Sequence, residues 1–449
     1  MKIDALVAEI GSTTTVLNAF CGLGTNSPRF LGQGQAPTTV LDGDVRIGLN
    51  NALDNLKLKL NAPALEYSTM LATGSAAGGL RMSVHGLVND MTVRAAKTAA
   101  LGAGAIVVNS TSGKLTEFDL ADLTALHPNL LLIAGGTDYG ERETALFNVR
   151  AIADAGVKIP IIYCGNIQNH SAVKEICEKS SIPLSITDNV YPKLDVLNIE
   201  PVRKRIHEMF EQHIVKAPGM EQIRELVDGR ILPTPGSVMM AAELLYSLLG
   251  DLLVLDIGGA TTDAHSVSEG SPEIAQMQTS PEPVAKRTVE GDLGLFVNAD
   301  NLAELIGRDK LSREIGFEYK TPPAIPLLPD EIKTAERLCL EAGITAVRRH
   351  AGQLRHLYTP QGRRTIAEGK DLTMIKHLVG TGGALTRLPN RAEILRKIAD
   401  CNENRMMLFP KKGELNLLFD NDYIMASLGV LSLSFKKDAE KLLLGSLGL

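Results

Sequence analysis

The feature that most constrains the fold is an acidic, glycine-rich turn that occurs twice in the chain. The first copy is VAEIGSTTTV at residues 7–16, and the second is VLDIGGATTD at residues 254–263. When the copies are aligned from their first valine, five of the first nine positions are identical, and Glu9 matches Asp256. Because β-branched threonines favour strands, each copy predicts a strand, a turn and a returning strand.

The chemistry of this turn suits an anionic ligand. Glycine lets the backbone approach a ligand closely, and the N–H groups of a turn can form an anion-binding concavity. A carboxylate at the strand end can hold Mg²⁺ through water molecules. A single turn of this kind is a weak signal, but two related copies predict two lobes that close on one polyphosphate and its metal.

A third glycine turn, VGTGGALTR at residues 379–387, follows the second copy. The pattern predicts a strand, a turn through Gly380, Gly382 and Gly383, and the start of a helix. Such a backbone could lie flat against a base or a ribose. Residues 329–358 are expected to be helical, and their end is markedly basic.

Between residues 88 and 200 the pattern changes to helices that alternate with short apolar strands, which predicts βα units on a parallel sheet. We therefore expect three regions. Residues 1–87 form a first nucleotide-binding lobe, completed by about 415–449, and residues 231–414 form a second lobe. Residues 88–230 form an inserted α/β domain with closing helices.

Composition excludes several classes of protein. The chain has 449 residues, a net charge of −6 and no long basic stretch, so we expect no nucleic-acid partner. No apolar run reaches about 18 residues, which predicts no membrane span. Five scattered cysteines without a C-x-x-C pair predict reduced thiols in a cytoplasmic protein. The sequence leaves homo-oligomer formation open.

With these motifs in this order, the chain resembles the actin, Hsp70 and sugar-kinase ATPase superfamily. The fold that this implies is a two-lobed α/β ATPase with ribonuclease H-like lobes. Segments 234–245 (TPGSVMMAAELL) and 422–432 (DYIMASLGVLS) resemble the two small-residue hinge helices of that fold.

The resemblance also implies the site residues and the cofactors ATP and Mg²⁺. It assigns catalytic roles to Glu9 and Asp256 and makes Glu9, Asp256 and Asp263 metal ligands. The residues implied to bind the nucleotide are Gly11, Ser12, Thr13, Gly258, Gly259, Thr261, Gly380, Gly382 and Gly383.

Within the superfamily, the chain resembles the glutamate mutase activator family, which is called MutL or GlmL and is unrelated to the mismatch-repair protein. The stretches that carry this are IAGGTDYGERE at 133–143, RTVEGDLGLFVNA at 287–299 and MLATGSAAGGLRMSV at 70–84. The resemblance implies an ATP-dependent chaperone that reactivates an adenosylcobalamin-dependent mutase or aminomutase.

Two positions depart from the superfamily pattern. Glu9 stands where the first motif usually has Asp. Thr234 precedes Pro235, where Hsp70-like members carry a Glu oriented toward the attacking water. This departure predicts a weak ATPase.

Other functions stay open from sequence. A small-molecule kinase of the same fold would need a carboxylate base near the acceptor hydroxyl, and only the metal-binding acids are candidates. A ring-opening amidohydrolase resembling hydantoinase A carries a similar turn in a longer chain. An ATP-binding scaffold with little hydrolysis would also fit Thr234.

Two further stretches have two interpretations each. In the loop at 133–143, Thr137 and Asp138 either cap the following helix or belong to a loop that touches a partner or a second ligand. The basic cluster of Arg348, Arg349, His350, Arg355 and His356 is either a solvated helix face or a docking surface for an acidic partner.

Overall fold

The computed structural model divides the chain into two compact units. It describes residues 1–39, 43–75, 80–103, 105–215, 223, 226–228, 231–278, 282, 284–359, 362–402 and 406–449. Unit 1 comprises Met1–Gly78, Glu211–Thr288 and Asp292–Leu449, and unit 2 comprises Gly79–Phe210 with Val289–Gly291. None of the helices in the described ranges is long and apolar enough to cross a membrane.

Unit 1 contains two five-stranded sheets with the same strand order. In the first, order β10-β4-β1-β2-β3, the strands are β1 (Lys2–Ile10), β2 (Thr14–Cys21), β3 (Arg29–Pro37), β4 (Glu66–Gly74) and β10 (Leu232–Pro233). In the second, order β13-β12-β11-β16-β17, they are β11 (Leu252–Ile257), β12 (Thr262–Val267), β13 (Ala285–Glu290), β16 (His377–Thr381) and β17 (Asn416–Phe419). In each sheet the earliest strand is central, with the next two strands on one side and the last two on the other.

The two repeated sequence motifs form the same hairpin in the two sheets. β1 and β2 are antiparallel, as are β11 and β12. The N–H of Gly11 donates to the carbonyl of Thr14, and that of Gly258 donates to Thr261, both at 3.0 Å. The structure therefore confirms the predicted fold class, a two-lobed actin/Hsp70-like α/β fold with a further α/β unit.

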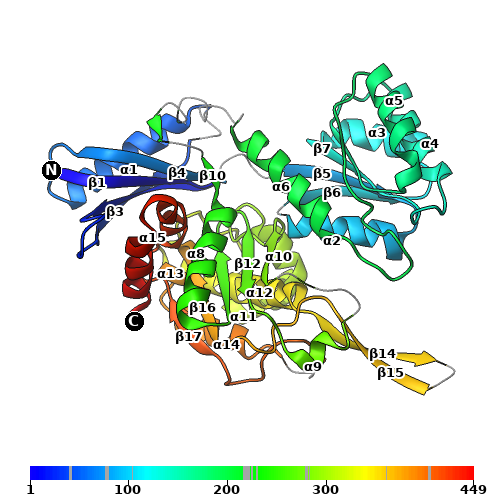
Figure 1. Ribbon diagram of the computed structural model, residues 1–449. Coiled ribbons are helices and arrows are strands. Elements are labelled where there is room, and N and C mark those ends of the chain that lie inside the picture. The colour runs from blue at the N-terminus through cyan, green and yellow to red at the C-terminus, as the bar shows by residue number, and fades with distance from the viewer. Residues whose placement is uncertain are drawn as a thin grey trace. The chain divides into compact units, whose positions relative to one another are not determined.

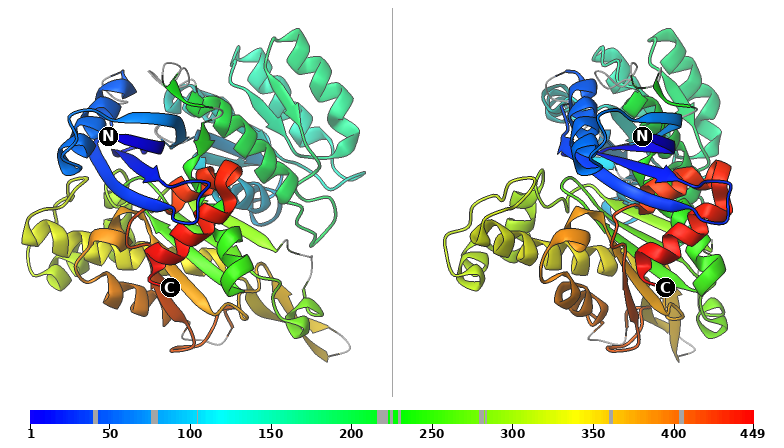
Figure 2. Two further views of the ribbon diagram at one scale, coloured as in Figure 1. Left: turned by 60° about the vertical axis from the view of Figure 1, so that its left-hand side comes forward. Right: turned by 90° about the vertical axis from the view of Figure 1, so that its left-hand side faces the viewer.

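Two helices, α8 (Thr234–Leu249) and α15 (Met425–Leu447), share one core with both sheets (Figures 1 and 2). Ala5 and Val7 of β1 and Val254 of β11 pack in this core, because alternate residues of a strand point to the same face. Glu9 and Asp256 continue these two rows. The strand period thus brings both acidic residues to the helix side of their sheets.

The remaining elements of unit 1 cover the outer faces. The helix α1 (Val45–Lys59) packs on β2 and β3. A second core lies on the other face of β11 and is formed with helices that follow it in the chain. These helices are α10 (Ala299–Ile306), α11 (Arg308–Ile315), α12 (Pro329–His350), α13 (Gly382–Arg387) and α14 (Arg391–Ala399), and the short helix α9 (Pro272–Ala275) follows β12.

The expectation that residues 329–358 are all helical is wrong at its end. α12 stops at His350, and β14 (Gln353–Thr359) pairs with β15 (Gly362–Glu368) in a hairpin that projects from unit 1 (Figure 1). Gly352 permits the close return of β15, because a Cβ there would lie 2.5 Å from the carbonyl oxygen of Glu368. His350 is buried, with its ring nitrogens 2.8 Å from the hydroxyls of Thr288 and Ser266, so it does not belong to a solvated face.

Unit 2 is a parallel sheet with helices on both faces (Figure 1). Its strand order is β6-β5-β7-β8-β9, and its core includes residues of α3, α4 and α5. The strands are β5 (Leu80–Gly86), β6 (Ala105–Ser112), β7 (Leu130–Ile133), β8 (Ile161–Tyr163) and β9 (Leu184–Ile186). The helices are α2 (Arg94–Gly102), α3 (Glu117–Leu126), α4 (Glu143–Asp154), α5 (His170–Lys179) and α6 (Glu200–Val215).

The strand β5 lies inside this sheet, between β6 and β7, although the sequence analysis assigned its residues to the first lobe. The inserted sheet therefore begins ahead of residue 88. The segment is hard to assign from sequence, because a short apolar strand after a glycine turn suits either sheet.

All five cysteines have free thiols, and four of them are buried.

The crossing of α8 and α15 leaves no room for a side chain at Gly429. A Cβ there would lie 1.8 Å from the carbonyl oxygen of Ser237. We expect Gly429→Ala to lower the free energy of unfolding by about 1–3 kcal/mol, because the helices must separate. Gly445 is the matched control on the same helix, with nothing within 4 Å of its Cβ position. Gly445→Ala should instead stabilise the chain by about 0.5–1 kcal/mol. Denaturant titration of both variants measures the difference, and equal effects would contradict the close crossing.

Each unit has its own hydrophobic core, so unit 1 should fold without unit 2. We expect a chain in which a short linker replaces residues 80–210 to be soluble and to melt in one cooperative transition. Circular dichroism during heating tests this. An insoluble product, or a melt without a cooperative transition, would show that unit 2 is part of the folding unit of unit 1.

Candidate functional site

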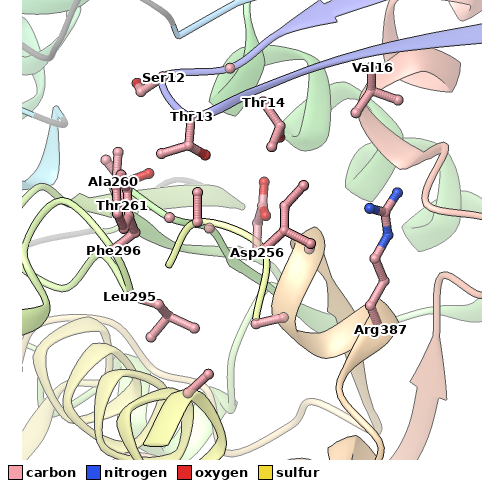
Figure 3. A pocket seen from close by; sticks show the side chains of 18 of the residues that line it. Ser12, Thr13, Thr14, Val16, Asp256, Ala260, Thr261, Leu295, Phe296 and Arg387 are labelled. Carbon is pink, nitrogen blue, oxygen red and sulfur yellow. The ribbon is translucent and has the colours of Figure 1, made fainter. Parts of the chain in front are cut away.

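A cavity of about 270 Å³ lies in unit 1 and is lined by both repeated turns (Figure 3). Its polar wall contains the first turn, including Ser12, Thr13 and Thr14, and the second turn with Asp256 and Thr261. Its apolar wall contains Leu295, Phe296, Pro322, Pro323, Ala324, Ile325, Pro326, Ile332, Ala335, Leu388 and Pro389. The cavity can therefore hold a ligand with one highly polar end and one flat or apolar end.

The two turns approach each other closely. A Cβ added to Gly259 would lie 2.9 Å from the hydroxyl oxygen of Thr13. Gly11, Ser12 and Thr13 line the cavity from the first turn, and Gly258, Gly259 and Thr261 line it from the second. The structure thus brings together the six turn residues that the sequence analysis selected, although they lie almost 250 positions apart.

Only part of the third turn lines the cavity, and the rest packs within the second sheet. Gly383 lines the cavity, whereas Gly380 lies within β16, where a Cβ would pack 3.3 Å from Leu385. Gly382 has a φ of +83°, and a Cβ there would lie 2.4 Å from Oδ1 of Asp256. Gly382 therefore allows this turn to pack directly against the strand that carries Asp256.

The second turn is held by the segment that follows β13. The N–H groups of Phe296 and Val297 both donate to the carbonyl of Gly259 at 2.8 Å. A Cβ on Gly294 would lie 2.3 Å from the carbonyl of Ala260, so only glycine permits this approach. The stretch at 287–299, one of the three that resemble the MutL family, thus holds the second turn in place by hydrogen bonds and close packing.

Asp256 and Asp263 are directly opposite each other on β11 and β12, and both line the cavity. Burial, together with the nearby charge of Asp420, raises the pKa of Asp256 from its ordinary value to about 7. A cation beside the carboxylate would favour its charged form. The electrostatics at Asp256 therefore suit a metal ion.

Glu9 lines the same cavity but is bonded to a neighbouring helix. Its Oε1 accepts hydrogen bonds from the hydroxyl of Ser427 at 2.6 Å, the N–H of Ser427 at 3.1 Å and the amide of Asn18 at 3.2 Å. Burial raises the pKa of Glu9 to about 8, against the hydrogen bond from Ser427, and Asp420 and Asp256 add to the rise. Glu9 therefore ties β1 to α15 at the edge of the cavity.

Sequence reasoning missed Arg387, which is the only basic side chain lining the cavity within the described part of the chain. Its guanidinium donates to the side-chain oxygens of Gln35 and Gln33, the latter at 2.6 Å, and lies 5.4 Å from the ring centre of Tyr423. Burial lowers the pKa of Arg387 below its usual value. The signal in the sequence that could have identified Arg387 was its position, four residues after Gly383 of the third turn.

The charges around the cavity favour a ligand that brings its own cations. Three lining carboxylates (Glu9, Asp256 and Asp263) face one guanidinium. Within the described residues, no three His, Cys, Asp or Glu side chains converge as a metal site. The arrangement instead fits Mg²⁺ held by one carboxylate, several waters and the oxygens of a ligand.

The position that would carry a catalytic Glu in Hsp70-like proteins is also part of the cavity. Thr234 lines it at the start of α8, and its hydroxyl donates to that of Thr73 at 3.3 Å. A threonine hydroxyl there cannot supply the charge of a carboxylate.

The solved structures that this chain resembles distantly include two reactivating factors. The diol dehydratase-reactivating factor in nucleotide-free form is 11% identical, with coverage of 97% of this chain and 100% of that chain and a TM-score of 0.37. The glycerol dehydratase reactivase is 12% identical, with coverage of 95% and 99% and a TM-score of 0.34. The fold assignment rests on the sheets of this chain rather than on these likenesses.

Sequence comparison gives a much closer match. Protein MutL of Clostridium tetanomorphum is 37% identical over 446 residues, which cover 95% of this chain and 95% of the relative. The family model for MutL protein matches residues 5–447. The predicted resemblance is thereby confirmed, and the chain belongs to the MutL protein family.

Proposed function

We propose that this chain is an ATP-binding reactivating factor for an adenosylcobalamin-dependent mutase or aminomutase. The observation that carries the nucleotide part is the pair of matching turns that meet across one cavity. Membership of the MutL family supports the partner part, through the association of that family with such mutases. In the proposed complex, the phosphates of ATP lie at the two turns and its base lies against the apolar wall.

The polar wall supports phosphate binding. Turn N–H groups can form an anion-binding concavity, and Gly259 allows the backbone to approach closely. The start of the sixteen-residue helix α8 also lines the cavity, and the positive end of a helix dipole favours an anion. Hydroxyls of Ser12 and Thr13 add donors for phosphate oxygens.

The apolar wall supports binding of a base. Leu295, Phe296 and the segment Pro322–Pro326 offer flat or apolar surface, and burial of such surface stabilises a complex by about 25 cal/mol per Å². A guanidinium can stack on an aromatic face, so Arg387 can also contact a base at this wall.

The metal part of the proposal assigns Mg²⁺ to Asp256. When bound, Mg²⁺ neutralises phosphate charge. Asp256 would hold and orient the ion through water, and Asp263 lies opposite Asp256 on β12. Glu9 positions β1 against α15 and has a lesser role toward the ion, since its Oε1 already accepts three hydrogen bonds.

The helices α8 and α15 can transmit nucleotide binding to the lobes. α8 starts at the cavity and α15 starts two residues after Tyr423, which lines it, so a ligand that draws the turns together changes how the helices cross. ATP can drive a change only through its different affinities for the two lobe arrangements. The second lobe at residues 231–414 and the completion of the first lobe by 415–449 stay part of this proposal, whereas the first segment of that lobe ends before β5 rather than at residue 87.

Thr234 favours a second candidate function, an ATP-binding scaffold with little hydrolysis. A carboxylate that orients the attacking water contributes strongly to phosphoryl transfer. Without it at position 234 we expect slow turnover, and slow turnover suits either a scaffold or a reactivating factor that exchanges nucleotide rarely.

We expect Asp256→Ala to weaken binding of ATP by at least about tenfold, or about 1.4 kcal/mol, in the presence of Mg²⁺. The reason is loss of the carboxylate that anchors the ion. Isothermal titration calorimetry with and without EDTA measures the effect. EDTA should weaken binding to the wild type strongly but to the variant little.

Glu9→Gln is the matched control for this experiment. The glutamine oxygen can still accept from Ser427 and Asn18, so we expect a change in ATP affinity of less than about threefold. Losses of equal size in the two variants would show that Glu9 is an equal ligand. Unchanged affinity in Asp256→Ala would remove the metal assignment.

The proposed activity itself is tested by rescue of an inactivated mutase. We expect the chain, with ATP, Mg²⁺ and fresh adenosylcobalamin, to restore activity to a mutase that has lost it during turnover. The mutase encoded nearest to this chain in its genome is the test enzyme. Asp256→Ala should fail to restore activity. Equal recovery without the chain, or with the variant, would leave only the scaffold function.

A further inference from the structure

The parallel sheet of unit 2 has an edge at which ligands and partners of such sheets bind. Its five strands have the order second-first-third-fourth-fifth, and the order reverses between β5 and β7. In open α/β sheets, binding occurs outside the carboxyl ends of the strands beside this reversal. The loops after β7, β8 and β9 lie at that edge, and the first of them is the stretch at 133–143 whose role the proposed function does not use.

A half-buried aspartate and two buried asparagines join these three loops by hydrogen bonds. Oδ1 of Asp138 accepts hydrogen bonds at 3.0 Å from the N–H of Ile167, in the loop after β8, and from the amide of Asn189, in the loop after β9. Asn166 closes the network, because its Oδ1 accepts from the N–H of Tyr139 at 3.3 Å. Asp138 therefore connects loops rather than capping α4, and Glu141 accepts from the N–H of Thr144 instead.

The locked loops expose large apolar side chains. Tyr139 is 77% exposed, Ile167 47%, Leu194 70% and Leu197 39%. We call these four residues the apolar rim. Large apolar side chains on rigid loops usually point inward, because each exposed one loses the stabilisation that burial would bring. Their exposure on a fixed frame is typical of an interaction site, where tyrosine is enriched and little ordering entropy is lost on binding.

The backbone at Tyr139 adds a second observation. Its φ is +63°, in the left-handed region that favours glycine and asparagine. Gly140 lies one position later, so a tyrosine rather than the glycine of this loop has the left-handed backbone conformation. Such strain persists where the surrounding structure and function require the side chain.

The charged residues around the apolar rim define what can bind. The three loops, at 137–143, 166–170 and 187–197, contain five carboxylates and two basic side chains, a local net charge of −3. Complementary charge steers association and fixes its register. The partner surface must therefore present apolar side chains or a cavity for Tyr139, bordered by lysine or arginine.

We propose that the apolar rim is the surface by which this chain docks the enzyme on which it acts, a protein with an apolar patch bordered by basic residues. This inference rests on the proposed function for the identity of that enzyme. It adds the place of contact, which lies in unit 2, on residues that do not line the nucleotide cavity of unit 1.

The test is binding of the full-length chain to the purified mutase in biolayer interferometry. Tyr139→Asn is the sharpest variant, because asparagine tolerates the left-handed backbone. We expect it to keep or raise the melting midpoint and to weaken mutase binding about tenfold, while calorimetry shows unchanged ATP affinity. Leu58→Ala is the matched control, since Leu58 is 76% exposed on α1 in unit 1 and should change nothing.

A second pair of variants tests the charge. Glu143→Lys with Asp188→Lys should weaken binding and reduce its dependence on salt, whereas Asp54→Lys with Glu66→Lys in unit 1 should do neither. If Tyr139→Asn and the double variant Glu143→Lys with Asp188→Lys both bind the mutase as tightly as the wild type, the docking surface is wrong. The proposed function would then stay intact. Failure of the wild-type chain to bind the mutase would overturn the proposed partner, and this docking assignment with it.

Discussion

The close crossing of α8 and α15 is the constraint on which the rest of unit 1 depends. Gly429 lies so near the carbonyl of Ser237 that no side chain fits between the helices, which share one core with strands of both sheets. Strands of both sheets pack on this pair, and their alternate residues point toward it. The acidic residues at the ends of β1 and β11 therefore meet at the same place, although no contact joins them along the sequence.

A polar network continues from this crossing to the cavity. Glu9 accepts from Ser427 on α15, and Asn18 bonds to both residues and to Gln33. Gln33 in turn accepts from Arg387 beside the third turn. The network spans β1, β2, β3, α15 and α13. A ligand that contacts Arg387 thus acts on side chains that also fix β1 against α15.

Much of the fold and of the site could be predicted because it is encoded locally. The repeated turns depend on glycine and threonine at fixed offsets, and the two copies have the same hydrogen bond at 3.0 Å. What failed depends on contacts distant in sequence. The backbone of Glu368 packs against Gly352 just after the end of α12, and β5 pairs with β6 and β7, which both follow it in the sequence. Gly382 packs against Asp256 and Ile257 of β11, and its role toward a ligand stays a prediction.

The departure at Glu9 has a physical account in these same contacts. Glu9 is 5% exposed, and its Oε1 receives both the N–H and the hydroxyl of Ser427. A carboxylate one methylene shorter would stop short of the helix by roughly a bond length, leaving buried donors of Ser427 and Asn18 without their acceptor at a cost of about 1–3 kcal/mol each. The longer side chain is thus suited to joining strand to helix, while Asp256 lies opposite Asp263 on the cavity wall. The acidic residue of the first copy is thus bonded to α15, whereas Asp256 and Asp263 of the second copy line the cavity opposite each other.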